Sequence, residues 1–403
     1  MVRFEIKKIF SKSTNKLTML VLVASLIMVS MLTINKVEYV DENGNSSTGI
    51  VAAKKIRDEK NQWSGYITDD VISKFIKENK EINQSKEALS KDFKEQNKAY
   101  AKKQGFSEIR DLITSVFSGF EDYDYYKVDS LTAKEASQLY EKRISNLKEY
   151  LNSGKEHFSD AEKEFLIKKY EELKTPFYYE YTGGWDILLQ DISTFILIVG
   201  LVIGVLVSGI FSDEFHLKTD SIFFASKLGR NKAIRSKIAA GICTTTLTYV
   251  IFVMLYTVIV LSVFGFDGAK CPIQISMWKS AYNITYFQMY LLIVLGGYVG
   301  TLFAATTCMI VSAKTRSTPV AIIIPFILLC GLPFLSRIIT MPEIYSNFPD
   351  QLFQVYVNIK DIGTSTIFGK VVNSESLIIP IYMLVSFGLQ PLLYRVYKKT
   401  EII

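Results

Sequence analysis

Long apolar runs alternate with polar segments along the 403-residue chain. A helix needs about 20 mostly apolar residues to cross the hydrocarbon core of a bilayer, and six runs meet or approach this length. They are residues 17–34, 192–211, 238–265, 286–312, 319–336 and 377–393, of which the last is the shortest. The pattern therefore predicts an all-α polytopic membrane protein with six transmembrane helices.

Basic residues predict the orientation of these helices. They cluster in residues 1–16, in the loop 212–237, at Lys314 and Arg316, and after the last apolar run. These segments all fall on one side of the membrane. Because cytosolic loops carry an excess of Lys and Arg, we expect a multi-pass protein of the plasma membrane with both termini in the cytosol. Residues 35–190 are then extracellular, and their 25 basic and 29 acidic residues give them a negative net charge.

Residues 1–16 interleave apolar and basic side chains. This pattern is typical of a short helix that lies at the cytosolic membrane interface, although a positively charged flank that only fixes topology explains the lysines equally well. The first apolar run, 17–34, could be mistaken for a secretory signal peptide. No small-residue cleavage site follows Ile34, so we expect this run to be retained as the first transmembrane helix.

Residues 35–190 have the pattern of a helical domain. A Lys- and Glu-rich helix is expected over 66–103, because apolar residues recur there at helical spacing. We expect a charged helical arm. An antiparallel coiled coil is one arrangement for it, although the heptads are not sustained. Two further helix starts are predicted by the capping-box spacing of Thr132 with Glu135 and of Ser159 with Glu162.

The sequence lacks the motifs of several common enzyme classes. It contains no G-x-x-x-x-G-K-[ST] nucleotide loop, no G-x-S-x-G and no H-E-x-x-H. Its 4 cysteines are scattered, and its 2 histidines are too few for a histidine-based metal cluster. We therefore expect no catalytic residues, no bound metal and no bound cofactor. The basic composition reflects membrane topology rather than a nucleic-acid partner.

The predicted transmembrane helices hold few ionisable side chains. A carrier driven by protons or sodium ions usually places carboxylates or broken helices near the middle of the membrane, so we expect the energy for any transport to come from another subunit. Small residues at G-x-x-x-G spacing let membrane helices approach closely. Two such pairs, Gly200 with Gly204 and Gly296 with Gly300, fit a dimer interface and packing within one chain equally well.

The loop 212–237 carries the most specific pattern in the chain. An acidic residue is followed by a Thr, an apolar pair, a Leu-Gly-Arg sequence and a Lys that opens the next helix. This order resembles the permeases of type-2 ABC exporters, whose pattern is roughly Glu, Gly-Thr, Leu-Leu, Pro-Ser-Arg, Lys. The matching positions are Glu214, Lys218-Thr219, Phe223/Phe224, Leu228-Gly229-Arg230 and Lys237, with Lys218 in place of the Gly and Leu228-Gly229 in place of Pro-Ser.

The resemblance implies a membrane-spanning permease subunit of an ATP-driven exporter that does not itself hydrolyse ATP. In such exporters this loop docks as a coupling helix on a separate ABC ATPase subunit, which binds ATP and Mg. Two permeases, either copies or paralogues, work together in the lipid bilayer. The cargo implied is a peptide, an antibiotic or a lipid-like molecule. The residues implied in coupling are Glu214, Thr219, Leu228, Gly229, Arg230 and Lys237.

The resemblance also implies a division of the chain. Residues 35–190 are an insertion that only some members of the family have. Residues 191–403 hold the other five transmembrane helices, together with the coupling loop 212–237 and an outer loop at 337–375.

A different class of function stays open, in which the chain is a membrane-anchored sensor or scaffold. Its extracellular domain would then bind an external ligand without transport.

Overall fold

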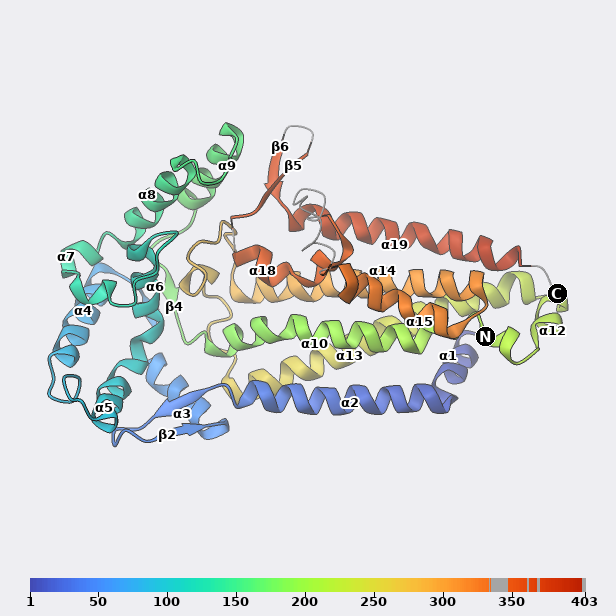
Figure 1. Cartoon of the computed structure of the whole chain (residues 1–403), viewed down its shortest axis with the longest axis horizontal. Helices are drawn as coiled ribbons and strands as arrows, with labels where there is room; N and C mark the ends of the chain where they lie inside the picture. Colours follow the sequence, from blue (N-terminus) through green and yellow to red (C-terminus); the bar gives the residue numbers. More distant parts are fainter. Residues whose placement is uncertain (333, 335–346, 361, 368–369, 401–403) are drawn as a thin grey trace.

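The computed structural model describes residues 1–332, 334, 347–360, 362–367 and 370–400 of the chain. About 72% of it is helical. Figure 1 shows an elongated molecule with a bundle of long helices at one end and an arm of short helices at the other. The N-terminal helix α1 (Val2–Ser11) and the end of α19 (Glu375–Lys398) lie at the end of the bundle that is far from the arm.

Five helices of the described residues are long and apolar enough to cross a membrane. They are α2 (Ser13–Ile34), α10 (Gly183–Ser208), α13 (Ile234–Phe264), α14 (Tyr286–Thr315) and α19. The run 319–336 corresponds to a shorter apolar helix, Thr318–Gly331, in which a π-helical turn follows α15 (Thr318–Phe326). The predicted polytopic helical protein is thus confirmed. Residues 333, 335 and 336 of this fifth run lie outside the described residues.

Helix α10 lies at the centre of the bundle together with α14. It contacts α2, α13, α14 and α15, and 61% of its apolar stretch is buried, as in α14, against 22% for α2 and for α19. Helices α2 and α19 turn large apolar side chains outward, among them Leu20, Ile27 and Leu384. Because a broad apolar surface of this kind is costly in water and favourable in lipid, the arrangement agrees with insertion into a bilayer.

The glycines of both G-x-x-x-G pairs pack against segments of the same chain. Gly200 and Gly204 on α10 face the segment 325–329, and the glycines on α14 face the segment 352–355. A Cβ atom on Gly204 would lie 2.4 Å from Pro325 Cγ, which is closer than real Cβ contacts. The same holds on α14 for Gly296 and Gly300, which lie against Leu352, Phe353 and Val355. Packing within one chain therefore accounts for all four glycines.

The arm consists of short helices and two small antiparallel sheets. Strand β1 pairs with β2, and β3 pairs with β4. The capping boxes at Thr132 and Ser159 are confirmed, and they open α7 and α9. In chain order the elements are β1 (Glu38–Val40), β2 (Ser46–Thr48), α3 (Ile50–Asn61), β3 (Gly65–Tyr66), α4 (Asp69–Asn83), α5 (Phe93–Lys103), α6 (Ser107–Ser118), α7 (Ala133–Ala136), α8 (Leu139–Asn152), α9 (Asp160–Glu171) and β4 (Tyr178–Tyr179).

The structure differs from the sequence prediction in the length of the arm's helices. The helix expected over 66–103 is broken into α4 and α5, because Asp92 caps a new helix start by accepting a hydrogen bond from the Lys94 amide. The longest helix of the arm, α4, has 15 residues, so a hairpin of two long coiled-coil helices is wrong. Side chains such as Phe75 and Phe106 instead join a hydrophobic core that continues into the bundle.

Further elements lie in the connections between the long helices. The loop from α10 to α13 holds α11 (Asp213–His216), α12 (Asp220–Ala225) and a π-helical turn at Gly229–Ala233. In the outer segment 337–375, residues 337–346, 361, 368 and 369 lie outside the described part of the chain. The rest of that segment holds a 3₁₀ turn at Pro349–Phe353, α18 (Val355–Lys360) and a hairpin of β5 (Thr364–Ile367) and β6 (Lys370–Asn373).

Candidate functional site

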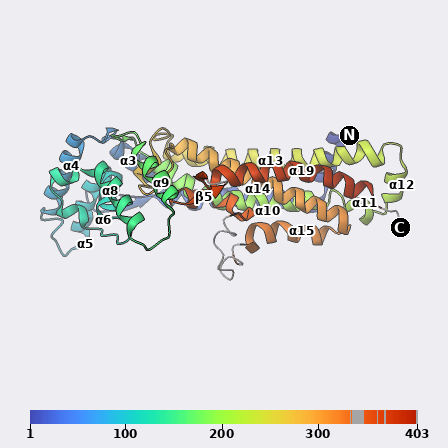
Figure 2. The same cartoon turned by 90° about the horizontal axis from the view of Figure 1, so that it is seen from above.

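The loop 212–237 lies at the end of the bundle that is far from the arm (Figures 1 and 2). Its first helical turn, α11, carries Glu214, whose side chain is 9% exposed. Lys237 lies in the first turn of α13 and is fully buried. The structure thus places the first and the last residue of the sequence motif in the protein interior.

Glu214 and Lys237 are the centre of a buried ion cluster. The Lys237 ammonium group donates hydrogen bonds to Glu214 Oε1 at 2.7 Å, to Glu5 Oε2 at 3.1 Å and to the Ile210 carbonyl oxygen at 3.1 Å. Lys8 Nζ donates a 2.8 Å hydrogen bond to the same Glu214 oxygen. Two carboxylates and two ammonium groups therefore balance one another, which reduces the cost of burying each charge.

Thr219 holds the second oxygen of the Glu214 carboxylate. Its Oγ1 donates a 2.9 Å hydrogen bond to Glu214 Oε2. Burial raises the pKa of Glu214, but the ammonium groups of Lys237 and Lys8 outweigh burial and lower this pKa to about 2. The carboxylate is therefore ionised at neutral pH, and its contacts with Lys8 and Lys237 join α11 to α1 and α13.

Arg230 connects the loop to the last long helix. Its Nη1 donates hydrogen bonds to the backbone carbonyl oxygens of Lys398 at 2.8 Å and Thr400 at 3.3 Å. The guanidinium group also lies 4.9 Å from the centre of the Phe224 ring. A helix leaves its last carbonyl groups without intrahelical partners, so a cation at the end of α19 is favourable.

Tyr397 of α19 is surrounded by aromatic side chains of the loop and its flanks. It is fully buried, and its ring centre lies 4.8 Å from that of Phe211 and 5.2 Å from that of Phe224. Phe215 and Phe223 lie at 6.3 Å and 6.0 Å. The loop is thus packed against α19 and bonded to α1 and α13, so a displacement of the loop would be passed to all three helices.

Other side chains of the loop face outward. Ile222 on α12 is 73% exposed, Leu217 is 62% exposed and Leu228 is 48% exposed. Exposed apolar side chains on one short loop form a candidate contact surface for a partner. The backbone of the loop requires a glycine at position 229, because a Cβ atom on Gly229 would lie 1.8 Å from the Phe223 carbonyl oxygen.

The predicted coupling residues occupy three different environments. Glu214, Thr219 and Lys237 meet in the buried cluster. Leu228 faces outward beside the sterically restricted Gly229. Arg230 contacts the end of α19. The first group is therefore internal to the chain, and of the six predicted coupling residues Leu228 is the one that is exposed to a partner.

Sequence reasoning missed three residues that the structure adds to the site, namely Glu5, Lys8 and Tyr397. Glu5 and Lys8 lie three positions apart on α1, which places them on one face of that helix. Opposite charges at this spacing on an amphipathic N-terminal helix were the available signal. Tyr397 had no such signal, because its role depends on the folding of the loop against the last helix.

The charged groups of the site are paired with one another rather than arranged around an open reaction centre. Among the residues that the structure describes, no group of three or more His, Cys, Asp or Glu side chains could hold a metal ion. No protein-family model and no curated protein matches this chain. The geometry of the loop therefore has to carry the functional interpretation.

Proposed function

We propose that this chain is the membrane-spanning permease subunit of an ATP-driven ABC exporter and that a separate ABC ATPase subunit docks on the loop 212–237. The observation that carries the proposal is the combination, within one loop, of an exposed apolar helix and a buried ion cluster. Helix α12 offers Ile222 to a partner. Glu214 and Lys237 bond the same loop to α1 and α13. A force applied at the surface of the loop therefore reaches several long helices.

The energy is proposed to come from the partner because the chain carries no nucleotide-binding motif of the G-x-x-x-x-G-K-[ST] type. ATP and Mg²⁺ then bind to the ATPase subunit, and closure of two ATPase subunits moves two permeases against each other. The second permease is either a second copy of this chain or a paralogue. The loop is bonded to α1 and to the ends of α13 and α19, so this movement would be transmitted to helices that enter the membrane.

The orientation and the cargo belong to the same proposal. Both termini and the loop 212–237 face the cytosol, where the excess of Lys and Arg supports their position. Residues 35–190 face the outside of the plasma membrane as an extracellular helical domain, and the apolar helix Thr318–Gly331 starts the fifth of six membrane spans. The cargo is a peptide, an antibiotic or a lipid-like molecule.

A membrane-anchored sensor or scaffold is the second candidate function, and one contact of the arm favours it. Arg143 on α8 donates hydrogen bonds to the carbonyl oxygens of Trp278 at 2.9 Å and Ser280 at 3.0 Å. These residues lie in the connection between α13 and α14. A ligand on the arm would thus act on two long helices without any cargo crossing the membrane.

Co-expression of the chain with any ABC ATPase whose open reading frame adjoins its gene tests the main proposal. We expect the two proteins to co-purify and the ATPase activity of the complex in proteoliposomes to exceed that of the isolated ATPase. An ATPase variant that cannot hydrolyse ATP serves as the control. A chain that purifies alone and leaves the ATPase activity unchanged would contradict the transport proposal and favour the sensor.

A further inference from the structure

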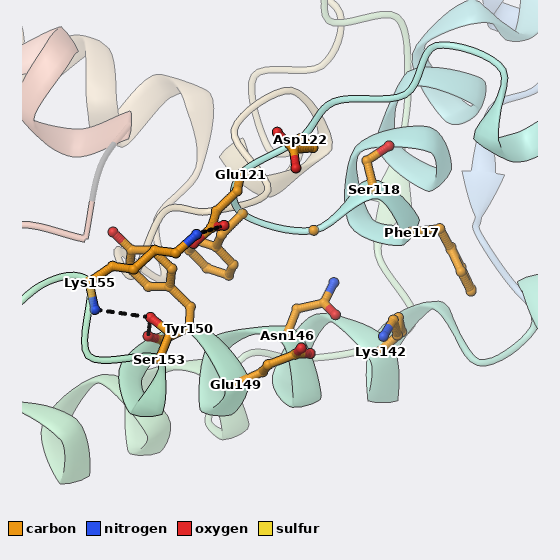
Figure 3. Close-up of a pocket in the computed structure, with 12 residues that line it drawn as sticks. Phe117, Ser118, Glu121, Asp122, Lys142, Asn146, Glu149, Tyr150, Ser153 and Lys155 are labelled. Carbon is orange, nitrogen blue, oxygen red and sulfur yellow. Dashed lines mark hydrogen bonds and ion pairs between the residues drawn. The ribbon is translucent and has the colours of Figure 1, made fainter.

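An open pocket of about 480 Å³ lies on the arm, between the loop 117–122 and helix α8 (Figure 3). The end of α6 and the loop after it form one wall, and side chains of α8 form the other. The pocket is far from the loop 212–237, which lies at the opposite end of the molecule (Figure 1). The coupling proposal therefore gives it no role.

The base of this pocket is aromatic. Phe120 stacks on Tyr150 with ring centres 4.6 Å apart, and it meets the Trp278 ring edge to face at 4.9 Å. Lys279 donates a hydrogen bond to the Phe120 carbonyl oxygen and places its ammonium group 5.2 Å from the centre of the Phe120 ring. The wall is therefore fixed by packing before any ligand arrives, and it is joined to the connection between α13 and α14.

Asn146 presents an unused hydrogen-bond acceptor in the same pocket. The residue is 5% exposed, and its Nδ2 donates a hydrogen bond to the Val116 carbonyl oxygen. The orientation of the amide is thus set, because a carbonyl oxygen can only accept. Among the described residues none donates to Asn146 Oδ1, and the side chain lines the pocket (Figure 3). A nearly buried acceptor without a protein donor favours a ligand that donates.

The charged side chains that line the pocket also favour a ligand that donates hydrogen bonds and carries positive charge. Glu121 is paired with Lys155. Asp122 and Glu149 form no ion pair with any described residue, and Lys142 is the one other cation among the described side chains that line the pocket. Among the side chains that line the pocket, the unpaired charges are therefore two negative and one positive, since the Lys279 ammonium group lies outside the lining, on the Phe120 carbonyl oxygen. The Asn146 oxygen adds a further acceptor.

We propose that this pocket binds a cationic amine or guanidinium group, such as the N-terminus or a basic side chain of a peptide. An ammonium or guanidinium group has only hydrogen-bond donors. It would therefore satisfy Asn146 Oδ1 and pair with Asp122 and Glu149. An anionic group would face two unpaired carboxylates instead. This site does not depend on the transport function, because it is defined by binding to the arm alone.

A ligand in this pocket could also affect the long helices, because the pocket lies beside a contact between the arm and the bundle. Arg143 lies next to the pocket residue Lys142 on α8, and it holds the carbonyl oxygens of Trp278 and Ser280. Its guanidinium group is buried over the Tyr170 ring at 3.7 Å. A ligand that moves α8 or Phe120 would thus displace the segment 278–280, which connects α13 to α14.

Calorimetric titration of the full-length chain in lipid nanodiscs with trilysine amide tests the proposal, with triglutamate as the oppositely charged probe. We expect trilysine amide to bind and triglutamate not to bind. The variants Asp122→Asn and Glu149→Gln should each weaken binding roughly threefold, which is the effect of one exposed charge contact. Both positions are exposed, so these variants should fold normally.

The matched control is Glu164→Gln, which removes an exposed carboxylate from α9 of the same arm but outside the pocket. We expect it to leave the affinity unchanged. An equal loss in Glu164→Gln would show general attraction to an acidic arm and would overturn the site. Failure of the wild-type chain to bind trilysine amide would overturn it as well. Because no ATPase is present, neither result depends on whether the chain is an exporter subunit.

Discussion

Lys237 donates a 2.7 Å hydrogen bond to Glu214 and thereby joins the first turn of α13 to α11. A fully buried lysine is costly in an apolar interior, but this one also has Glu5 and the Ile210 carbonyl oxygen as acceptors. Membrane topology alone would explain the basic residues of the loop, but this bond also gives the loop a structural role, because it fixes α11 to α13. Through Glu5, Lys237 is also bonded to the N-terminal helix.

Removal of the buried ammonium group should destabilise the protein strongly. Lys237→Met leaves Glu214 and Glu5 without their shared buried partner, and breaking a buried ion pair in this way costs about 3 kcal/mol or more. The free energy of unfolding in mixed micelles measures the effect. Lys7→Met is the matched control, because Lys7 is an exposed lysine on α1, the helix that carries Glu5. Equal losses in the two variants would contradict the structural role of the cluster.

The ion cluster should also make stability depend on pH. The pKa of Glu214 is lowered from 4.5 to about 2 in the folded protein, so its ionised form contributes stability above about pH 4.5. That contribution is lost as the pH falls from 4.5 towards 2. The difference in unfolding temperature between wild type and Glu214→Gln should therefore shrink on acidification below pH 4.5. A difference that is the same at pH 7 and pH 3 would argue against this electrostatic contribution.

The close approach at Gly229 predicts a backbone requirement in the loop. Gly229→Ala would place a methyl group 1.8 Å from the Phe223 carbonyl oxygen, so the loop must shift. We expect a loss of about 1 to 3 kcal/mol in stability, as for other overpacked positions. Gly388→Ala is the control, because nothing lies within 4 Å of its Cβ position among the described residues. Thermal unfolding that ranks the two variants equally would contradict the observed loop path.

The arm's hold on the connection between α13 and α14 can be measured by hydrogen exchange. Arg143→Met removes the donors to the Trp278 and Ser280 carbonyl oxygens, so amide exchange in this connection should become faster. Lys148→Met on the same helix removes only an exposed ion pair with Glu171, which contributes little. If the two variants exchange alike in this connection, Arg143 does not hold it.

The sequence predicted the long helices because the membrane imposes a simple rule, an apolar run of sufficient length. It also predicted the starts of α7 and α9, whose capping boxes are local signals. It failed where a local break competed with a helical pattern, as at Asp92, which divides the helix expected over 66–103.

Only the part of the candidate site that lies within the loop 212–237 was predictable from the sequence. Glu214, Thr219 and Lys237 were selected from the loop, and the structure brings them together. Their partners Glu5 and Lys8 come from the other end of the sequence, and Tyr397 comes from the last helix. Such contacts depend on packing between distant segments, which no local pattern encodes.

Binding of an ABC ATPase that co-purifies with the chain, measured on the full-length chain in nanodiscs, tests the central claim most directly. Ile222→Asp places a charge on the exposed face of α12, whereas Leu89→Asp makes the same change at an equally exposed position of the arm, 74% against 73%. We predict that Ile222→Asp weakens ATPase binding at least about tenfold, which is about 1.4 kcal/mol, because loss of an apolar contact at the centre of an interface costs about 2 kcal/mol or more. Leu89→Asp should bind like the wild type. Equal binding by all three proteins would contradict the claim that energy enters through this loop.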